Sequence, residues 1–177
     1  DYATKSASTG ERVKNMMLKS PVLAQPTFAH YALAELCQRG LIKQWVQQNH
    51  DGLPQKADVP QSILNEIHGA WFDPSNPVVK MDDSLRDDLF TRLLEWEQST
   101  DLTISLGTSM SGMNSDRVFT TVATKAAKQF RRKVPKADTG GTVIGGVIVG
   151  IQCTQYDDLA SLRIFAKIDR VMAMLMV

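Results

Sequence analysis

The chain contains few cysteines and no long apolar segment. Its 177 residues include two cysteines, Cys37 and Cys153, too few for a disulfide framework or a four-cysteine zinc site. The longest apolar stretch, residues 145–151, has the length of a strand and falls well short of the roughly 20 residues that a membrane-spanning helix needs. These absences predict an intracellular protein, cytoplasmic or nuclear, with no metal site and no membrane partner.

Neither sign of charge dominates. Twenty Lys and Arg against nineteen Asp and Glu give a formal net charge of +1 at pH 7, so no strong field attracts nucleic acid or anionic lipid. One basic cluster is interpreted as the solvated end of a helix rather than a nucleic-acid contact. Its members are Lys125, Lys128, Arg131, Arg132, Lys133 and Lys136. With 43% apolar residues, the chain has the composition of one globular domain.

Helical and strand patterns alternate along the sequence. Helices are expected from Thr27 to Gly40, from Ser84 to about Trp96, from Ser115 or Asp116 to about Lys133, and over the last ten residues. Strands are expected at 41–48, 63–68, 102–106 and 142–151. Strands that alternate with helices predict βαβ units, and therefore an α/β fold with a parallel sheet.

Polar clusters follow three of the predicted strands, at residues 48–52, 68–69 and 107–109. Ligands bind at the carboxyl ends of the strands of a parallel sheet. Each cluster alone has an ordinary explanation, as a turn, a helix entry or a hydrogen-bonded histidine. The three together at one edge of the sheet favour a polar binding site.

The same segments resemble the motifs of the sirtuins, which are NAD-dependent protein deacylases and ADP-ribosyltransferases. The family pattern reads Pro-Thr-x-x-His, Gln-Asn-x-Asp-Gly-Leu, Glu-Leu-His-Gly and Leu-Gly-Thr-Ser-Leu. Similar stretches occur in the same order at residues 26–30, 48–53, 66–69 and 106–110, and residues 148–164 resemble the nuclear chromatin-type branch. The resemblance implies a Rossmann-like parallel sheet with helices on both faces, NAD as cofactor, and an acyl-lysine protein or peptide as partner.

The resemblance also implies roles for single residues. His68 matches the general base that accepts a proton from the ribose hydroxyl of NAD, work that suits an imidazole with an unperturbed pKa of about 6.5. The matching cofactor-binding residues are Gln48, Asn49 and Asp51 for the nicotinamide ribose and carboxamide, and Gly107, Thr108 and Ser109 for the phosphate and ribose. The implied products are deacylated lysine, nicotinamide and an acyl-ADP-ribose.

Several family features are missing from the chain. The first cofactor loop, Gly-Ala-Gly-Ile-Ser, does not occur, and Asp1-Tyr2 is interpreted as a remnant of the segment that follows it. Residues 1–177 are therefore expected to be an N-terminally incomplete NAD-binding domain. Residues 69–83 contain no cysteine and are interpreted as a reduced insertion loop in place of the zinc module. Pro54 and Gly150 stand where the family has His and Asn.

These departures leave two alternatives to the deacylase. One is a weak or inactive sirtuin-fold module that binds or supports partners within a larger assembly. The other is an ADP-ribosyltransferase or NAD-cleaving enzyme that uses the same pocket. A serine hydrolase is excluded, because the spacing of residues 107–112 does not fit a nucleophile elbow and no histidine follows His68.

Overall fold

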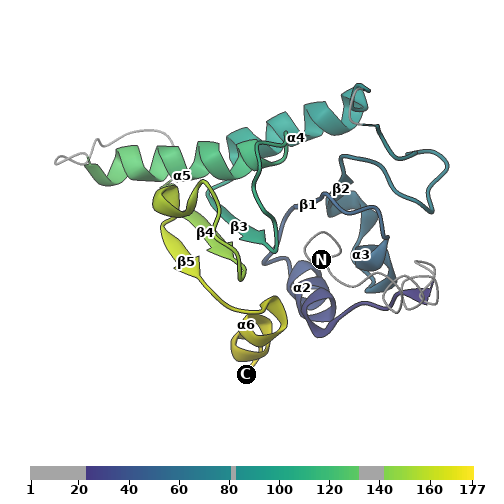
Figure 1. Cartoon of the computed structure of the whole chain (residues 1–177), viewed down its shortest axis with the longest axis horizontal. Coiled ribbons are helices and arrows are strands. Elements are labelled where there is room, and N and C mark those ends of the chain that lie inside the picture. The colour runs from purple at the N-terminus through teal and green to yellow at the C-terminus, as the bar shows by residue number, and fades with distance from the viewer. Residues whose placement is uncertain (1–22, 81–82, 132–141) are drawn as a thin grey trace, which may run out of the picture.

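The computed structural model describes residues 23–80, 83–131 and 142–177 (Figure 1). The helices are α2 (Phe28–Gln38), α3 (Leu53–Lys56), α4 (Asp87–Ser99), α5 (Asp116–Arg131) and α6 (Ile168–Leu175). The strands are β1 (Trp45–Gln47), β2 (Leu64–Glu66), β3 (Leu102–Leu106), β4 (Gly145–Val149) and β5 (Leu162–Ile164). Short 3₁₀ helices lie at Gln61–Ile63 and Asp157–Leu159. The alternation of helices and parallel strands confirms the α/β class.

All the strand pairs are parallel, but in the described residues they form two sheets instead of the single sheet expected. β1 pairs with β2, and β3, β4 and β5 form the second sheet in that order. Helices α4 and α5 lie on one side of the strands, and α2 and α6 lie on the other (Figure 1). Helices therefore cover both faces, as predicted.

The helix pair α2 and α6 connects the two sheets. Ala29 and Leu33 of α2 and Met172 of α6 form a buried cluster, against which Trp45 of β1 and Leu106 of β3 pack. The first turns of the two helices are also joined, since the backbone N–H of Ala29 donates to Asp169 Oδ1 at 2.8 Å. The carboxyl ends of β1 and β3 are thus held over one shared apolar support.

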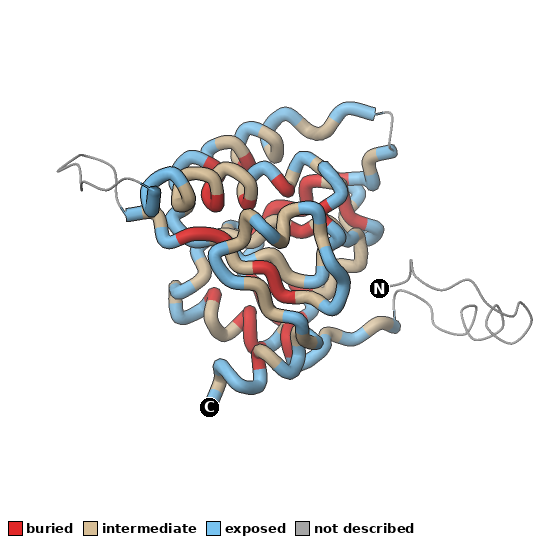
Figure 2. The backbone as a smooth tube through the Cα atoms, turned by 60° about the vertical axis from the view of Figure 1, so that its left-hand side comes forward, coloured by how far each residue is buried: buried red, intermediate tan, exposed pale blue. Residues whose placement is uncertain are grey.

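On the opposite side, α5 packs closely against β4. The ring of Phe119 lies so near Gly146 that a Cβ there would be 2.5 Å from it, so only glycine fits beneath this helix. Phe119 and Ile148 belong to a second buried cluster with Met110 and Ala123. Buried backbone is concentrated between the two helical layers (Figure 2).

Most element boundaries agree with the sequence prediction. Thr27 is the N-cap of α2, and Gly40, with φ of +69°, follows its end. Ser84, however, does not cap α4: the N-cap is Arg86, whose guanidinium bonds to Asp88 and to the carbonyl of Ser75. The strand expected at 41–48 shortens to β1, since residue 41 lies in a bend and residues 42–44 have no regular secondary structure.

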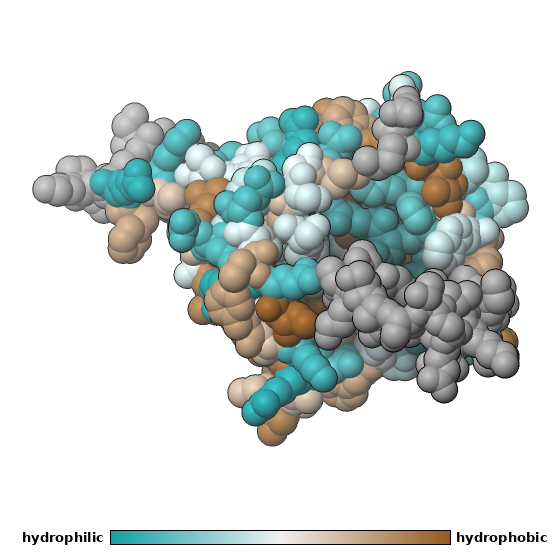
Figure 3. Space-filling view, viewed as in Figure 1, coloured by the Kyte–Doolittle hydropathy of each residue, from teal (hydrophilic) through white to brown (hydrophobic). Residues whose placement is uncertain are grey.

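Two predictions on charge and hydrophobicity can be placed on this fold. Lys128 and Arg131 are exposed in the last turn of α5, whereas the interpreted neighbours at 132, 133 and 136 and the remnant at Asp1-Tyr2 lie outside the described residues. In the described ranges, no helix is both long and apolar enough to cross a membrane. On the face seen in Figure 3, hydrophilic and apolar residues are interspersed.

Candidate functional site

The carboxyl ends of β1 and β3 meet through a side-chain hydrogen bond. Thr108, two residues after β3, donates from its hydroxyl to Gln48 Oε1 at 3.3 Å. The amide of Gln48 bonds in turn to the hydroxyl of Ser115, just before α5. Two of the three polar clusters identified in the sequence therefore lie together, as their places at strand ends predict.

The loop after β3 is shaped by its glycine. Gly107 has a φ of +62°, and a Cβ there would lie 2.9 Å from Ile168 Cδ1 at the start of α6. Its N–H donates to the carbonyl of Val149 at 3.0 Å, which extends the β3–β4 pairing into the loop. Thr108 Oγ1 accepts the N–H of Met110 at 3.1 Å, and Ser109 is exposed. The loop is thus fixed in shape while Gly107 and Ser109 stay accessible.

The turn after β1 divides its polar groups between internal bonds and solvent. Asp51 Oδ1 accepts the N–H of Leu53 at 3.1 Å and the amide of Gln47 at 3.5 Å, which supports the start of α3. Asn49 is exposed, and its side chain makes no hydrogen bond within the described part of the chain. Asn49 is therefore the side chain of this turn that is free to bind a ligand.

His68, the third cluster, lies two residues after β2 and is half-buried. Its Nε2 is buried and has no hydrogen-bond partner among the described residues. Burial lowers the pKa of His68, and repulsion from His50 lowers it further, whereas the Gln48 backbone and the Asp116 carboxylate act in the opposite direction. A neutral imidazole with an unpaired buried nitrogen is a competent proton acceptor at neutral pH.

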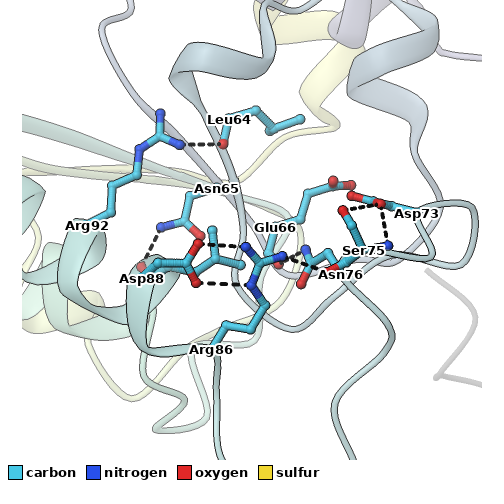
Figure 4. Close-up of polar contacts among 10 residues, drawn as sticks. Leu64, Asn65, Glu66, Asp73, Ser75, Asn76, Arg86, Asp88 and Arg92 are labelled. Atoms are coloured by element: carbon cyan, nitrogen blue, oxygen red, sulfur yellow. Dashed lines mark hydrogen bonds and ion pairs between the residues drawn. The ribbon is translucent and has the colours of Figure 1, made fainter.

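The segment after His68 closes on itself through backbone bonds. Gly69 has a φ of +83°, and Val79 donates its N–H to the carbonyl of His68 at 3.0 Å. Ala70 donates to the carbonyl of Asn76 at 2.9 Å, and the buried Asn76 amide donates to the Glu66 carbonyl at 3.0 Å (Figure 4). In the described part of this loop and of the chain, no three His, Cys, Asp or Glu side chains come together as metal ligands.

Two residues that contact the candidate site, Ser115 and His50, had no role assigned from the sequence. Ser115 enters through its bond with Gln48, and His50 bonds through Nδ1 to the carbonyl of Gly69 at 2.9 Å. Ser115 was visible in the sequence only as a helix start, and His50 occupies the variable position of its motif. No local pattern marks either as a neighbour of its partner, which is 67 residues away for Ser115 and 19 for His50.

Comparisons with known proteins find similarity to sirtuins, the family that the sequence motifs resemble. No family model matches the chain. The NAD-dependent protein deacetylase SRT1 of Oryza sativa subsp. indica is 28% identical over 187 residues, covering 85% of this chain and 35% of the relative. Sirtuin-7 of Homo sapiens, also named an NAD-dependent protein deacetylase, is 25% identical over 195 residues, covering 86% of this chain and 45% of the relative. The chain thus spans less than half the length of these relatives.

Solved structures show the same fold. A Sir2 complex with the inhibitor EX-527, 2'-O-acetyl-ADP-ribose and a deacetylated p53 peptide matches with a TM-score of 0.70 at 21% identity, covering 94% of this chain and 77% of that one. A Sir2 complex with a p53 peptide and NAD+ matches with a TM-score of 0.68 at 21% identity, covering 94% and 76%. The chain is therefore similar in sequence to sirtuins and shares the Rossmann-like fold of Sir2.

Proposed function

We propose that the chain is an NAD-dependent protein-lysine deacylase in which His68 accepts the proton. The observation that carries this proposal is the buried Nε2 of His68, which has no partner among the described residues. An unpaired polar atom at such depth costs stability unless a ligand group bonds to it. A ribose hydroxyl is a suitable donor to that nitrogen.

The surrounding residues fit NAD in chemical type. The exposed amide of Asn49, with Gln48 and Asp51 beside it, would hold the nicotinamide ribose and carboxamide. Gly107, Thr108 and Ser109 would contact the phosphate and ribose, because an accessible glycine lets backbone approach a ligand closely. When bound, NAD supplies a ribose carbon that takes up the acyl oxygen as nicotinamide leaves.

His68 performs the protein's part of the proposed reaction. Since burial lowers the pKa of His68, its imidazole is neutral at pH 7 and Nε2 has a lone pair available. It would take the ribose proton through Nε2. The partner on this proposal is an acyl-lysine protein or peptide, like those that two of the Sir2 neighbours bind, and the setting is intracellular, cytoplasmic or nuclear.

One observation favours a second function. Both polar atoms of the Gln48 side chain are already bonded, to Thr108 and Ser115, so the cofactor must displace or share these bonds. A sirtuin-fold module that binds partners within a larger assembly, without turnover, would keep them. The two functions predict different results for substitution of His68: the deacylase loses its rate of nicotinamide release, whereas the binding module has no such rate to lose.

The test is nicotinamide release from NAD in the presence of an acetyl-lysine peptide. For the parent we expect turnover, and for His68→Ala a loss of about 10²–10⁴-fold, typical of removing a general base. His68→Asn is the matched variant, because it keeps a polar side chain at the site but cannot act as the base. Turnover in both variants at the parent rate contradicts the assignment, and no turnover in a folded parent favours the binding module.

A further inference from the structure

His50 contacts the backbone that directly follows His68. A carbonyl oxygen only accepts hydrogen bonds, so the 2.9 Å contact with Gly69 means that Nδ1 of His50 carries the proton and donates it. The carbonyl of His50 accepts the N–H of Trp71, also at 2.9 Å. One residue of the turn after β1 therefore holds the chain on both sides of Ala70.

These two bonds extend the pairing of β1 with β2 beyond its last ladder partners. The ladder ends with Gln47 opposite Glu66. The same register, continued by three residues, puts His50 opposite Gly69. Beyond the end of the strands, a hydrogen bond from the His50 side chain to the Gly69 carbonyl thus takes the place of a backbone bond between the two segments, next to His68.

The other side of His68 is held by the loop. Val79 donates its N–H to the carbonyl of His68, and a Cβ on Gly69 would lie 2.2 Å from the carbonyl oxygen of Pro77. Gly69 is therefore enclosed between Pro77 and His50 and has little freedom to move. His50 is the only one of these contacts made by a side chain, which makes it the one that mutation can remove selectively.

We propose that His50 is a positioning residue for His68: its bond to Gly69 fixes the backbone that carries the imidazole, and so fixes where Nε2 accepts a proton. The inference rests on the proposed function of His68. It concerns a residue at the variable position of the Gln-Asn-x-Asp motif, so the role belongs to this chain.

The alternative is that His50 only fills space beside Trp71. The two rings lie 6.0 Å apart between centroids with an interplanar angle of 49°. In that case any side chain of similar volume would serve, and the position of the His68 ring would not change. His50 and Asp116 are the charged groups that act on His68, in opposite directions. Replacement of His50 therefore removes a repulsion that lowers the pKa of His68.

The test compares the full chain with His50→Gln and His50→Ala. Glutamine keeps an N–H donor for Gly69 but has no titrating charge, whereas alanine has neither. We expect kcat for nicotinamide release to fall by about 10-fold to 10²-fold in His50→Ala, since small displacements of catalytic groups are that costly, and to recover in His50→Gln. The KM for NAD is expected to change less than the kcat does.

A second measurement does not depend on turnover. NMR titration of the His68 ring, without NAD, should give a higher pKa in both variants than in the parent, and ring shifts that change in His50→Ala and recover in His50→Gln. The Trp71 amide, bonded to the His50 backbone, reports whether the local fold persists through its hydrogen exchange. If the parent shows no turnover, the proposed function fails, and the His68 ring shifts still decide whether His50 positions His68.

Two results overturn the proposal. One is equal kcat in the parent and His50→Ala with the Trp71 amide still protected. The other is a set of His68 ring shifts that is the same in all three proteins, which would make His50 a space-filling neighbour of Trp71.

Discussion

Thr108 donates a hydrogen bond to Gln48, although the strands that precede them, β3 and β1, are not paired with each other in the described residues. The two residues follow strands of separate sheets in the described structure, and their 3.3 Å bond joins the carboxyl ends of β1 and β3. Beneath them, Trp45 and Leu106 pack on one apolar cluster shared by α2 and α6. The carboxyl ends of β1 and β3 are thus held together by the Thr108–Gln48 hydrogen bond and by the apolar cluster on which Trp45 and Leu106 pack.

The first prediction concerns this contact. Thr108→Val removes the hydroxyl that serves both Gln48 and the N–H of Met110, while it keeps the volume. We expect the free energy of unfolding to fall by about 1–3 kcal/mol, because Met110 is buried and its N–H loses its partner. NAD affinity, measured by calorimetry, should fall as well.

Thr103→Val is the matched control on β3, since Thr103 makes no side-chain hydrogen bond in the described structure. Urea unfolding of both variants measures the difference. Equal stability of the two variants would show that the Thr108 bond does not hold the sheets together.

The second prediction is a pH dependence of stability. Burial lowers the pKa of both His30 and His68 below the ordinary value of 6.5. The unfolded chain therefore binds more protons than the folded one below pH 6.5, so stability is fully present above that pH and declines as the pH falls from 6.5 towards the lowered pKa values. Denaturant unfolding from pH 8 to pH 5 should show this decline.

In His68→Asn the decline should be shallower, because only His30 then contributes. At pH 8 His30 and His68 are neutral in both the folded and the unfolded state, so a stability difference between parent and variant at that pH does not come from protonation of these two groups. A parent whose stability is constant down to pH 5 would contradict the lowered pKa values.

The sequence predicted which polar clusters lie together better than it predicted the hydrogen bonds between them. Strand ends are visible as apolar runs that stop at polar residues, so the clusters around Gln48 and Thr108 could be placed on one edge in advance. β5 was missed because its three residues are too short for a periodic signal, and α3 because its four residues begin with Leu-Pro. The contact of His50 with Gly69 depends on strand register and on tertiary packing, which no local pattern encodes.

The third prediction concerns Arg163, whose side chain holds the segment that follows β4. The guanidinium pairs with Asp157 at 2.8 Å and donates to the carbonyls of Gly150 at 3.1 Å and Ile164 at 2.8 Å. Its side chain is 11% exposed, so these bonds are poorly screened. The single ammonium group in Arg163→Lys cannot make all of these hydrogen bonds at once, so this substitution should lower the free energy of unfolding by about 1–3 kcal/mol.

The control is Arg86→Lys. Arg86 pairs with Asp88 at 2.6 Å, but the two side chains are 40% and 63% exposed, so no measurable change in the free energy of unfolding is expected. Thermal or urea unfolding distinguishes the two positions. Similar losses at both would mean that burial does not set the strength of these pairs.

The fourth prediction is that residues 69–83 hold their shape without zinc. The described part of the loop is closed by backbone bonds, including Ala70 to Asn76 and His68 to Val79, and contains no cysteine. Metal analysis of the purified chain should find no stoichiometric zinc, and a chelator should leave the melting temperature unchanged. Bound zinc at one equivalent, or a lower melting temperature with chelator, would contradict this prediction.

The last prediction compares two glycines with positive φ. Gly69 (φ +83°) has backbone atoms of Pro77 and Val78 within 2.7 Å of a built Cβ, whereas Gly112 (φ +94°) has no atom within 4 Å. Alanine is strained by its backbone conformation at both positions, at a cost of about 1–3 kcal/mol. Only at Gly69 must backbone also move apart, which would break the closure of the loop beside His68.

Gly69→Ala should therefore destabilise the chain by clearly more than Gly112→Ala in urea unfolding. It should also expose the Ala70 and Val79 amides to hydrogen exchange, since their bonds close the loop. Gly112→Ala separates the two causes, because it carries the backbone strain without the collision. Equal losses for the two variants, with both amides still protected in Gly69→Ala, would show that the loop yields to the added methyl group and that its close packing does not hold His68 in place.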